Sequence, residues 1–143
     1  MDLRKFSRLA REVDLFQGLT PEDIAKIYSR GMTMRVQKGE TVFFKGSVGS
    51  QMYVVLGGSV GVYDGQKRIA GLRTGDMFGE MALIDSAPRS ATVVADEDTH
   101  LFVLSETTFQ RLLTKRVSIW IFLNIIHTLS KRLRDANAHF AGS

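Results

Sequence analysis

The chain has 143 residues, of which 44% are hydrophobic, no cysteine and a formal net charge of +4 at pH 7. This length and composition can bury one core but hardly two, so we expect a single domain over residues 1–143. The lack of cysteine excludes disulfides, thiolate metal sites and a cysteine nucleophile, and it suits a reducing compartment, which favours the cytoplasm.

The N-terminal region, residues 1–31, has the spacing of two helices. Apolar side chains recur every three or four positions over residues 3–13, and the basic residues between them are expected to face water. A second helix should begin after Thr20, its N-cap, with Pro21 at the first position, and run to Arg30. No apolar stretch of the kind found in signal peptides or membrane anchors follows the basic residues.

From residue 32 the hydrophobic period changes from helical to alternating, which indicates strands. Gly and charged turns separate the segments at intervals of roughly 8 to 12 residues, as in antiparallel sandwiches and barrels. We therefore expect a mainly β protein in which residues 32–104 form an antiparallel, jelly-roll-like β-barrel with flanking helices. The predicted strands cover residues 32–37, 41–44, 51–56, 59–64, 67–73, 90–96 and 99–104.

Residues 105–139 return to a helical pattern, with a short helix after Ser105 and a longer one over about 118–138. Apolar residues nearly encircle the first half of the long helix, so one face cannot bury all of them. We expect a second copy of the chain to cover the rest, giving a homodimer that Ile125→Asp and Leu129→Asp should weaken more than they unfold the barrel. The alternative is that the whole stripe packs on its own barrel.

The most apolar window of the long helix is about 13 residues long, which is too short to span a membrane.

The segment 75–96, GDMFGEMALIDSAPRSATVVAD, brings glycines, a carboxylate and an arginine together. Residues 81–84 suffice for about one helical turn, headed by Glu80, which we expect to be buried. Free N–H groups at a helix start and the guanidinium of Arg89 are common ways to hold a phosphate. Glu80 cannot serve a phosphate, so it needs a hydroxyl partner.

The run FGEMALIDSAPRSATV resembles the phosphate-binding cassette of the cyclic nucleotide-binding domain family, of the type found in catabolite activators and protein kinase A regulatory subunits. KGETVFFKG, MYVVLGGSVGVY and LRTGDMFGE extend the resemblance. It implies that Glu80 accepts the ribose 2′-hydroxyl and that Arg89 pairs with the cyclic phosphate. The cassette, residues 78–92, supplies further candidate ligand residues: Phe78, Gly79, Met81, Ala82, Ser90 and Ala91, with backbone amides around Gly79, Glu80, Ala82, Ser90 and Ala91. The alternative is a β-turn-β connection with a structural Glu80–Arg89 ion pair.

The base preference is inferred from one cassette position and from the polar residues of the long helix. In the family, serine at the position of Ser90 occurs in cAMP-binding bacterial activators, which favours cAMP over cGMP. On the long helix, Asn124 and Thr128 lie one turn apart and offer polar groups for base contacts, and Arg132 is also in register. Both nucleotides stay open as ligands.

Catalysis has little support in the sequence. The three histidines have no ligand or relay spacing, and neither a P-loop nor a nucleophile elbow is present, so we expect no enzyme, no metal and no cofactor. The positive excess lies after residue 104 and is better explained as a solvated helix face than as a nucleic-acid surface.

Two functional classes remain. The first is a sensor that binds a cyclic nucleotide and passes its occupancy on through the C-terminal helices. The second is a degenerate domain that serves as a dimerisation or interaction module with an empty pocket. Either could also be the fragment of a larger transcription regulator, channel or kinase.

Overall fold

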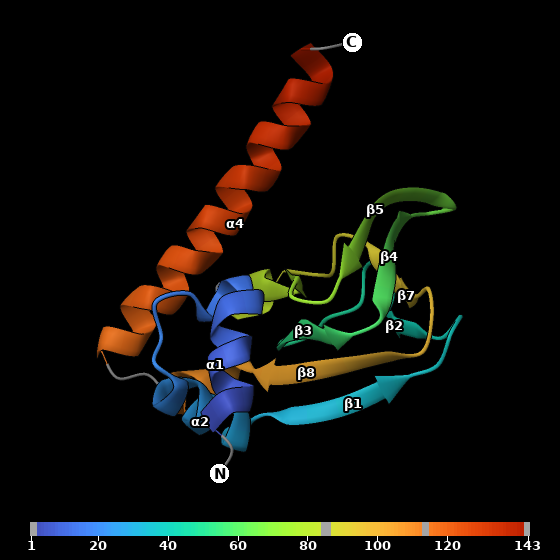
Figure 1. Cartoon of the computed structure of the whole chain (residues 1–143). Coiled ribbons are helices and arrows are strands. Elements are labelled where there is room, and N and C mark those ends of the chain that lie inside the picture. Colours follow the sequence, from blue (N-terminus) through green and yellow to red (C-terminus); the bar gives the residue numbers. More distant parts are fainter. Residues whose placement is uncertain (1–2, 84–86, 113–114, 142–143) are drawn as a thin grey trace.

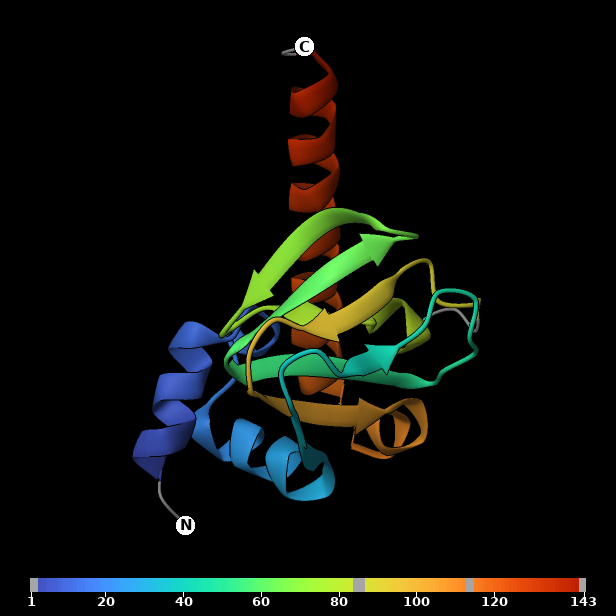
Figure 2. The same ribbon diagram turned by 90° about the vertical axis from the view of Figure 1, so that its right-hand side faces the viewer.

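Two four-stranded antiparallel sheets form the barrel in a computed structural model that describes residues 3–83, 87–112 and 115–141. The first sheet has the order β1 (Met32–Val36), β8 (Thr99–Ser105), β3 (Gln51–Gly57) and β6 (Met77–Phe78). The second has the order β2 (Thr41–Phe43), β7 (Thr92–Ala95), β4 (Ser59–Asp64) and β5 (Lys67–Arg73). Figure 2 shows the two sheets curving around a common interior.

This arrangement confirms the predicted mainly β, antiparallel barrel fold. The predicted bounds of β4 and β5 agree with the structure, whereas β7 is shorter than predicted. The sequence analysis missed β6, because two residues are too few to show an alternating pattern.

Strands β3 and β8 are buried on both faces, which explains why their apolar residues run almost without interruption. Alternate residues such as Tyr53 and Leu101 point into the barrel core, which contains residues of both sheets. The residues between them, such as Met52 and Phe102, belong to a second core beneath the helices. The second core joins the barrel to both helical regions.

The N-terminal helical region packs in this second core against side chains of β3 and β8, and Figure 1 shows its helices beside the ends of β8 and β1. These helices are α1 (Leu3–Glu12) and α2 (Pro21–Arg30), with a short 3-10 helix, η1 (Asp14–Phe16), between them. Thr20 caps α2 as predicted: its hydroxyl accepts the Asp23 N–H at 3.2 Å, and the Asp23 carboxylate accepts the Thr20 N–H at 3.1 Å. Leu15 and Phe16 of η1 are fully buried, so the segment between the two helices is part of the core.

Two helices follow the barrel, α3 (Glu106–Leu112) and the 27-residue α4 (Lys115–Ala141). The first part of α4 packs beside η1, and its C-terminal part projects beyond the barrel (Figure 1). Among the helices of the described ranges, none combines the length and hydrophobicity that crossing a bilayer requires.

One expectation about α4 is wrong. Ile125 is fully buried in the helical core, and Leu129 packs against that core, so an aspartate at Ile125 would disrupt the domain itself. The sequence did not show this, because the first half of α4 is apolar on nearly every side and its pattern does not indicate which side faces inward. Among the described side chains of α4, other large apolar residues are exposed: Ile119, Trp120, Phe122, Leu123, Ile126 and Leu133.

Candidate functional site

Glu80 begins a 3-10 turn, η2 (Glu80–Leu83), directly after Gly79. Gly79 has φ +72°, a left-handed conformation that favours glycine, and the chain reverses there from β6 into the turn. Glu80 is 3% exposed, as expected of a buried carboxylate. Its predicted short turn is confirmed for residues 81–83, whereas Ile84 lies outside the described residues.

The buried carboxylate is paired with a cation from α4. Arg132 Nη1 lies 2.7 Å from Glu80 Oε1, and Arg132 Nη2 donates to the carbonyl of Met77 at 2.6 Å. The ion pair that we considered between Glu80 and Arg89 does not form, because each of these side chains has other partners.

Arg89 lies just before β7 and is 9% exposed. Its Nη2 donates to the carbonyl of Gln51 at 2.7 Å and its Nη1 to that of Gly79 at 3.3 Å. The guanidinium carbon is 4.3 Å from the centre of the Phe43 ring, within the range of a cation–π contact. The Arg89 side chain is therefore oriented from three sides without a direct carboxylate partner among the described residues.

The third donor group of this guanidinium is unused. Nε of Arg89 is buried and has no hydrogen-bond partner among the described residues. Burial lowers the pKa of Arg89, and Tyr53 and Glu80 partly oppose that effect. A buried cation with an unsatisfied donor is the local arrangement that an incoming anion would stabilise.

Two glycines make room for Arg89. A Cβ atom at Gly49 would lie 2.6 Å from Nη2, and one at Gly79 would lie 2.8 Å from Nη1. Both distances are shorter than real contacts allow, so any other residue would displace the guanidinium. The cassette and the loop before β3 are also joined by backbone hydrogen bonds of 2.8 Å from Arg89 to Ser47 and from Gly46 to Arg89.

The remaining cassette residues differ in their accessibility. Phe78 is buried and stacks on Tyr53 at 5.0 Å between ring centres, next to Phe43. Met81 is 46% exposed, Ser90 is exposed and Ala91 is buried. Ala82 is buried and its N–H donates to the carbonyl of Gly79 at 3.1 Å, so this N–H is not open to a phosphate in this structure.

Asn124 and Thr128, the predicted base contacts on α4, have different surroundings. Asn124 is buried, and its Nδ2 donates to the carbonyls of Leu15 and Gln17, each at 2.8 Å. Its two donors therefore tie α4 to η1, which counts against a base contact from this amide. Thr128 is half-buried and lines a groove.

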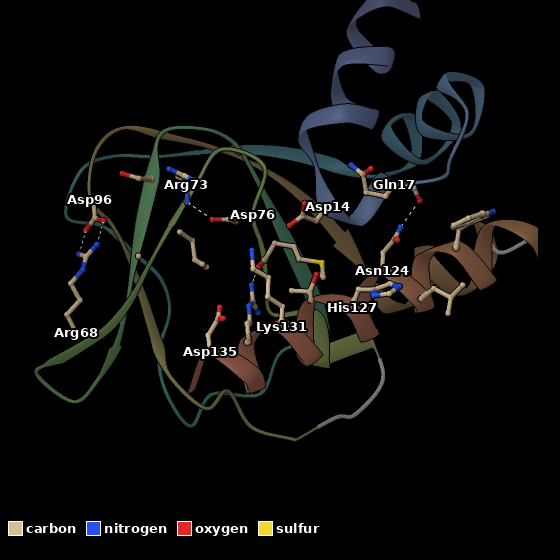
Figure 3. A pocket seen from close by; sticks show the side chains of 18 residues that line it. Asp14, Gln17, Arg68, Arg73, Asp76, Asp96, Asn124, His127, Lys131 and Asp135 are labelled. Atoms are coloured by element: carbon tan, nitrogen blue, oxygen red, sulfur yellow. Dashed lines mark hydrogen bonds and ion pairs between the residues drawn. The ribbon is translucent and has the colours of Figure 1, made fainter. Parts of the chain in front are cut away.

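That groove, with a volume of about 1000 Å³, lies between α4 and the β4–β5 hairpin (Figure 3). It contains Met77 and Arg132 but neither Glu80 nor Arg89, so it opens beside the ribose-acceptor candidate. Acidic and basic side chains are equally numerous along it, and Arg68 forms a bidentate pair with Asp96 at 2.8 Å. The charged lining residues are Asp14, Arg68, Arg73, Asp76, Asp96, Lys131, Arg132 and Asp135.

Nothing in the described ranges has the composition of a metal centre: no group of three His, Cys, Asp or Glu side chains there could hold an ion. The site thus consists of a buried cation with a free donor, a buried carboxylate, and the glycines and aromatic rings that position them.

Comparison with known proteins agrees with this geometry. The family model of the cyclic nucleotide-binding domain matches residues 33–116, more than half of the chain. The chain is 35% identical over 128 residues to the cyclic AMP receptor protein of Thermus thermophilus, with 86% of this chain and 58% of that protein covered. It is 32% identical over 110 residues to the cAMP-dependent protein kinase regulatory subunit of Hypocrea atroviridis, with 77% of this chain and 24% of that protein covered.

A solved structure is similar to this chain in fold as well as in sequence. The crystal structure of the Thermus thermophilus catabolite activator protein has a TM-score of 0.78 at 32% identity, covering 90% of this chain and 62% of that one. This chain therefore spans between about a quarter and three fifths of the length of these relatives. The family match, over the segment that holds Glu80 and Arg89, shows that the chain belongs to the cyclic nucleotide-binding domain family, whose members are regulatory ligand-binding domains rather than enzymes.

Proposed function

We propose that this chain is a cAMP sensor that binds the cyclic phosphate at Arg89 and the ribose at Glu80. The observation that carries the proposal is the Arg89 guanidinium, buried without a carboxylate partner and with Nε unbonded among the described residues. A cyclic phosphate has one negative charge and several acceptor oxygens, so it would supply both the missing charge and the missing acceptor. The glycines at positions 49 and 79 support this reading, because a side chain at either position would displace the guanidinium from its place.

The assignment of Glu80 to the ribose follows from its chemistry. An ionised carboxylate only accepts hydrogen bonds, so it would repel the phosphate and favour a hydroxyl donor. Arg132 pairs with one oxygen of Glu80 at 2.7 Å, which offsets part of the cost of burying the charge. The base would then extend toward the groove, where Thr128 remains a candidate contact and Asn124 a weaker one.

Occupancy of the site would be transmitted through α4. This helix reaches the cassette through Arg132 and η1 through Asn124, so it contacts both the ligand-binding segment and the N-terminal helices. A ligand that binds one position of α4 better than another must shift the helix toward that position. The opposing proposal, an interaction module with an empty pocket, gives no reason for an unbonded buried donor on Arg89.

The preference for cAMP rests on Ser90 and on the relatives. One similar protein is described as a cyclic AMP receptor and another as the regulatory subunit of a cAMP-dependent kinase. We propose that cAMP is also the ligand of this chain, with cGMP as the alternative.

We also propose that the chain acts without catalysis and without binding nucleic acid. A cytoplasmic location stays a prediction.

Calorimetric titration with cAMP and cGMP tests the proposed function. We expect both to bind, with cAMP tighter, and Glu80→Ala to weaken cAMP while abolishing the preference for cAMP over 2′-deoxy-cAMP. The reason is that the acceptor for the hydroxyl is gone; a hydrogen bond to a charged group contributes about 1.5–3 kcal/mol. Absence of binding by the wild type would favour the empty-pocket module, and tighter cGMP binding would reverse the preference.

A homodimer through α4 is the second part of the proposal. The exposed large apolar side chains of α4 include Ile119, Ile126 and Leu133, at 58%, 59% and 63% exposure. Apolar groups at this density on one helix are typical of surfaces that a partner covers. Pairing two α4 helices about a two-fold axis would bury them, and each 100 Å² of apolar area would contribute roughly 2.5 kcal/mol.

The expected result for Ile126→Asp is a shift of the protein from dimer to monomer, with the domain still folded. An aspartate there would place a charge in the proposed interface, whereas in the monomer the position is open to water. Sedimentation at micromolar concentration measures the change, with and without cAMP. Gln110→Asp, the same change of charge at an exposed position of α3, is the control and should stay dimeric. A monomeric wild type under both conditions would end this part of the proposal.

A further inference from the structure

The guanidinium of Arg89 lies over an aromatic ring. Its central carbon is 4.3 Å from the centre of the Phe43 ring and 5.9 Å from that of the Tyr53 ring, both within the range of about 6 Å over which a ring attracts a cation. The two terminal nitrogens donate to the backbone carbonyls of Gln51 and Gly79. The direct partners of this buried cation in the described part of the chain are therefore neutral groups.

Phe43 belongs to a cluster of three rings that comes from both sheets. It extends from β2, whereas Tyr53 and Phe78 extend from β3 and β6. The centre of the Phe43 ring is 5.8 Å from that of Tyr53 and 5.9 Å from that of Phe78, and the latter two rings stack at 5.0 Å. Tyr53 and Phe78 are buried in the barrel core, so they fix the half-buried Phe43 ring against Arg89.

A ring and a carboxylate hold a cation in different ways. A carboxylate pairs with the edge donors of a guanidinium and neutralises its charge. The face of a ring attracts the cation through its quadrupole and leaves both the net charge and the edge donors available. On Arg89 the donor without a partner within the described ranges is Nε. A carboxylate in the place of Phe43 would compete with an incoming phosphate for this side chain, whereas the ring does not.

We propose that Phe43 is a positioning residue for the cyclic phosphate: its ring holds the Arg89 guanidinium in place by a cation–π contact and leaves the positive charge available to the ligand. The proposal rests on the proposed function and deepens it. Without the ring, Arg89 would occupy its phosphate-binding position for a smaller fraction of the time, and the apparent affinity would fall with that fraction. Phe43 has this effect without touching the nucleotide.

Calorimetric titration with cAMP after stepwise fluorination of the Phe43 ring tests the contact. Fluorine withdraws electron density from the face of a ring, so it weakens cation–π attraction while the shape of the side chain changes little. We expect the affinity for cAMP to fall progressively from phenylalanine through mono-, di- and trifluorophenylalanine at position 43. Phe43→Leu, which has no ring, should weaken binding roughly 5- to 30-fold, the fold-change of a contact worth about 1–2 kcal/mol.

The same fluorinated residues at position 109 are the control. Phe109 is buried on α3 and meets Phe122 edge-on at 5.6 Å between ring centres, so its fluorination should leave the affinity for cAMP unchanged. Phe43→Tyr keeps the aromatic face and should bind cAMP more tightly than Phe43→Leu. Thermal melting without ligand shows which variants are folded. If Phe43→Leu is not folded, the fluorinated variants carry the test, because they keep the shape of the side chain.

A stepwise loss at position 43 supports the proposal, since a packing role alone would not follow the electron density of the ring. Fluorinated variants that bind cAMP as tightly as the wild type, or more tightly, overturn it, even if Phe43→Leu binds weakly, because the ring would then act through its volume. In that case a wild type that binds cAMP leaves the proposed function standing. A wild type that binds neither cAMP nor cGMP would instead overturn the proposed function and this inference together.

Discussion

Replacement of Arg89 by alanine is expected to reduce cyclic nucleotide affinity roughly 30-fold to several thousandfold, which corresponds to about 2–5 kcal/mol. The phosphate would then lie partly desolvated beside the Phe43 and Tyr53 rings, without the cation that the structure places there. Glu80 would remain in the cassette as a negative charge that repels the phosphate. The loss should therefore exceed that of Glu80→Ala.

The measurement is calorimetric titration with cAMP, supported by thermal melting without ligand to show that the variant is folded. Arg89→Lys is the matched variant: it retains the charge but not the planar fork, so its affinity should lie between those of wild type and Arg89→Ala. Arg111→Ala, at an exposed position of α3, should bind like the wild type. If Arg89→Ala binds cAMP as tightly as the wild type, the phosphate has been placed wrongly.

The largest expected effect on stability comes from Ile125→Asp. Ile125 is fully buried in the apolar cluster that includes residues of η1, α2 and α4. Burying an unpaired charge in such a core costs at least about 4 kcal/mol, a large share of the 5–15 kcal/mol that stabilises a typical domain. The melting temperature should therefore fall by about 10 °C or more.

Thermal melting followed by circular dichroism measures this change. Ile69→Asp makes the same substitution at an isoleucine of β5 that is 53% exposed, and it should shift the melting temperature only slightly. Ile125→Val removes one methylene and should cost about 0.5–1.5 kcal/mol. A variant Ile125→Asp that melts like the wild type would show that α4 does not dock on the N-terminal helices in solution.

The sequence predicted most of the fold because its signals are local. Alternation of apolar residues marks the strands, and Thr20 with Pro21 marks the start of α2 through interactions within four residues. The burial of Glu80 was predicted for a similar reason, since it begins a short apolar turn after a glycine. The resemblance of the cassette to a known family also came from one continuous run of residues.

What the sequence did not predict depends on contacts between distant segments. Arg132 was known to be in helical register with Asn124 and Thr128, but its pairing with Glu80 joins residues that are 52 positions apart. The same holds for Asn124, whose amide bonds to η1 across more than 100 positions. Such pairings follow from how α4 docks, and the apolar residues that nearly encircle its first half do not specify that orientation.

The two attachments of α4 also define a mechanical lever. Asn124 and Arg132 hold the helix at points eight residues apart, a span of about 12 Å at 1.5 Å per residue. Beyond the second attachment the described part of α4 continues from Leu133 to Ala141, a further stretch of about 13 Å that projects past the barrel (Figure 1). If α4 moved as a rigid rod about Asn124, a displacement at Arg132 would double by the time it reached Ala141. On the proposed function, small adjustments around the carboxylate of Glu80 would then become larger displacements at the far end of the helix.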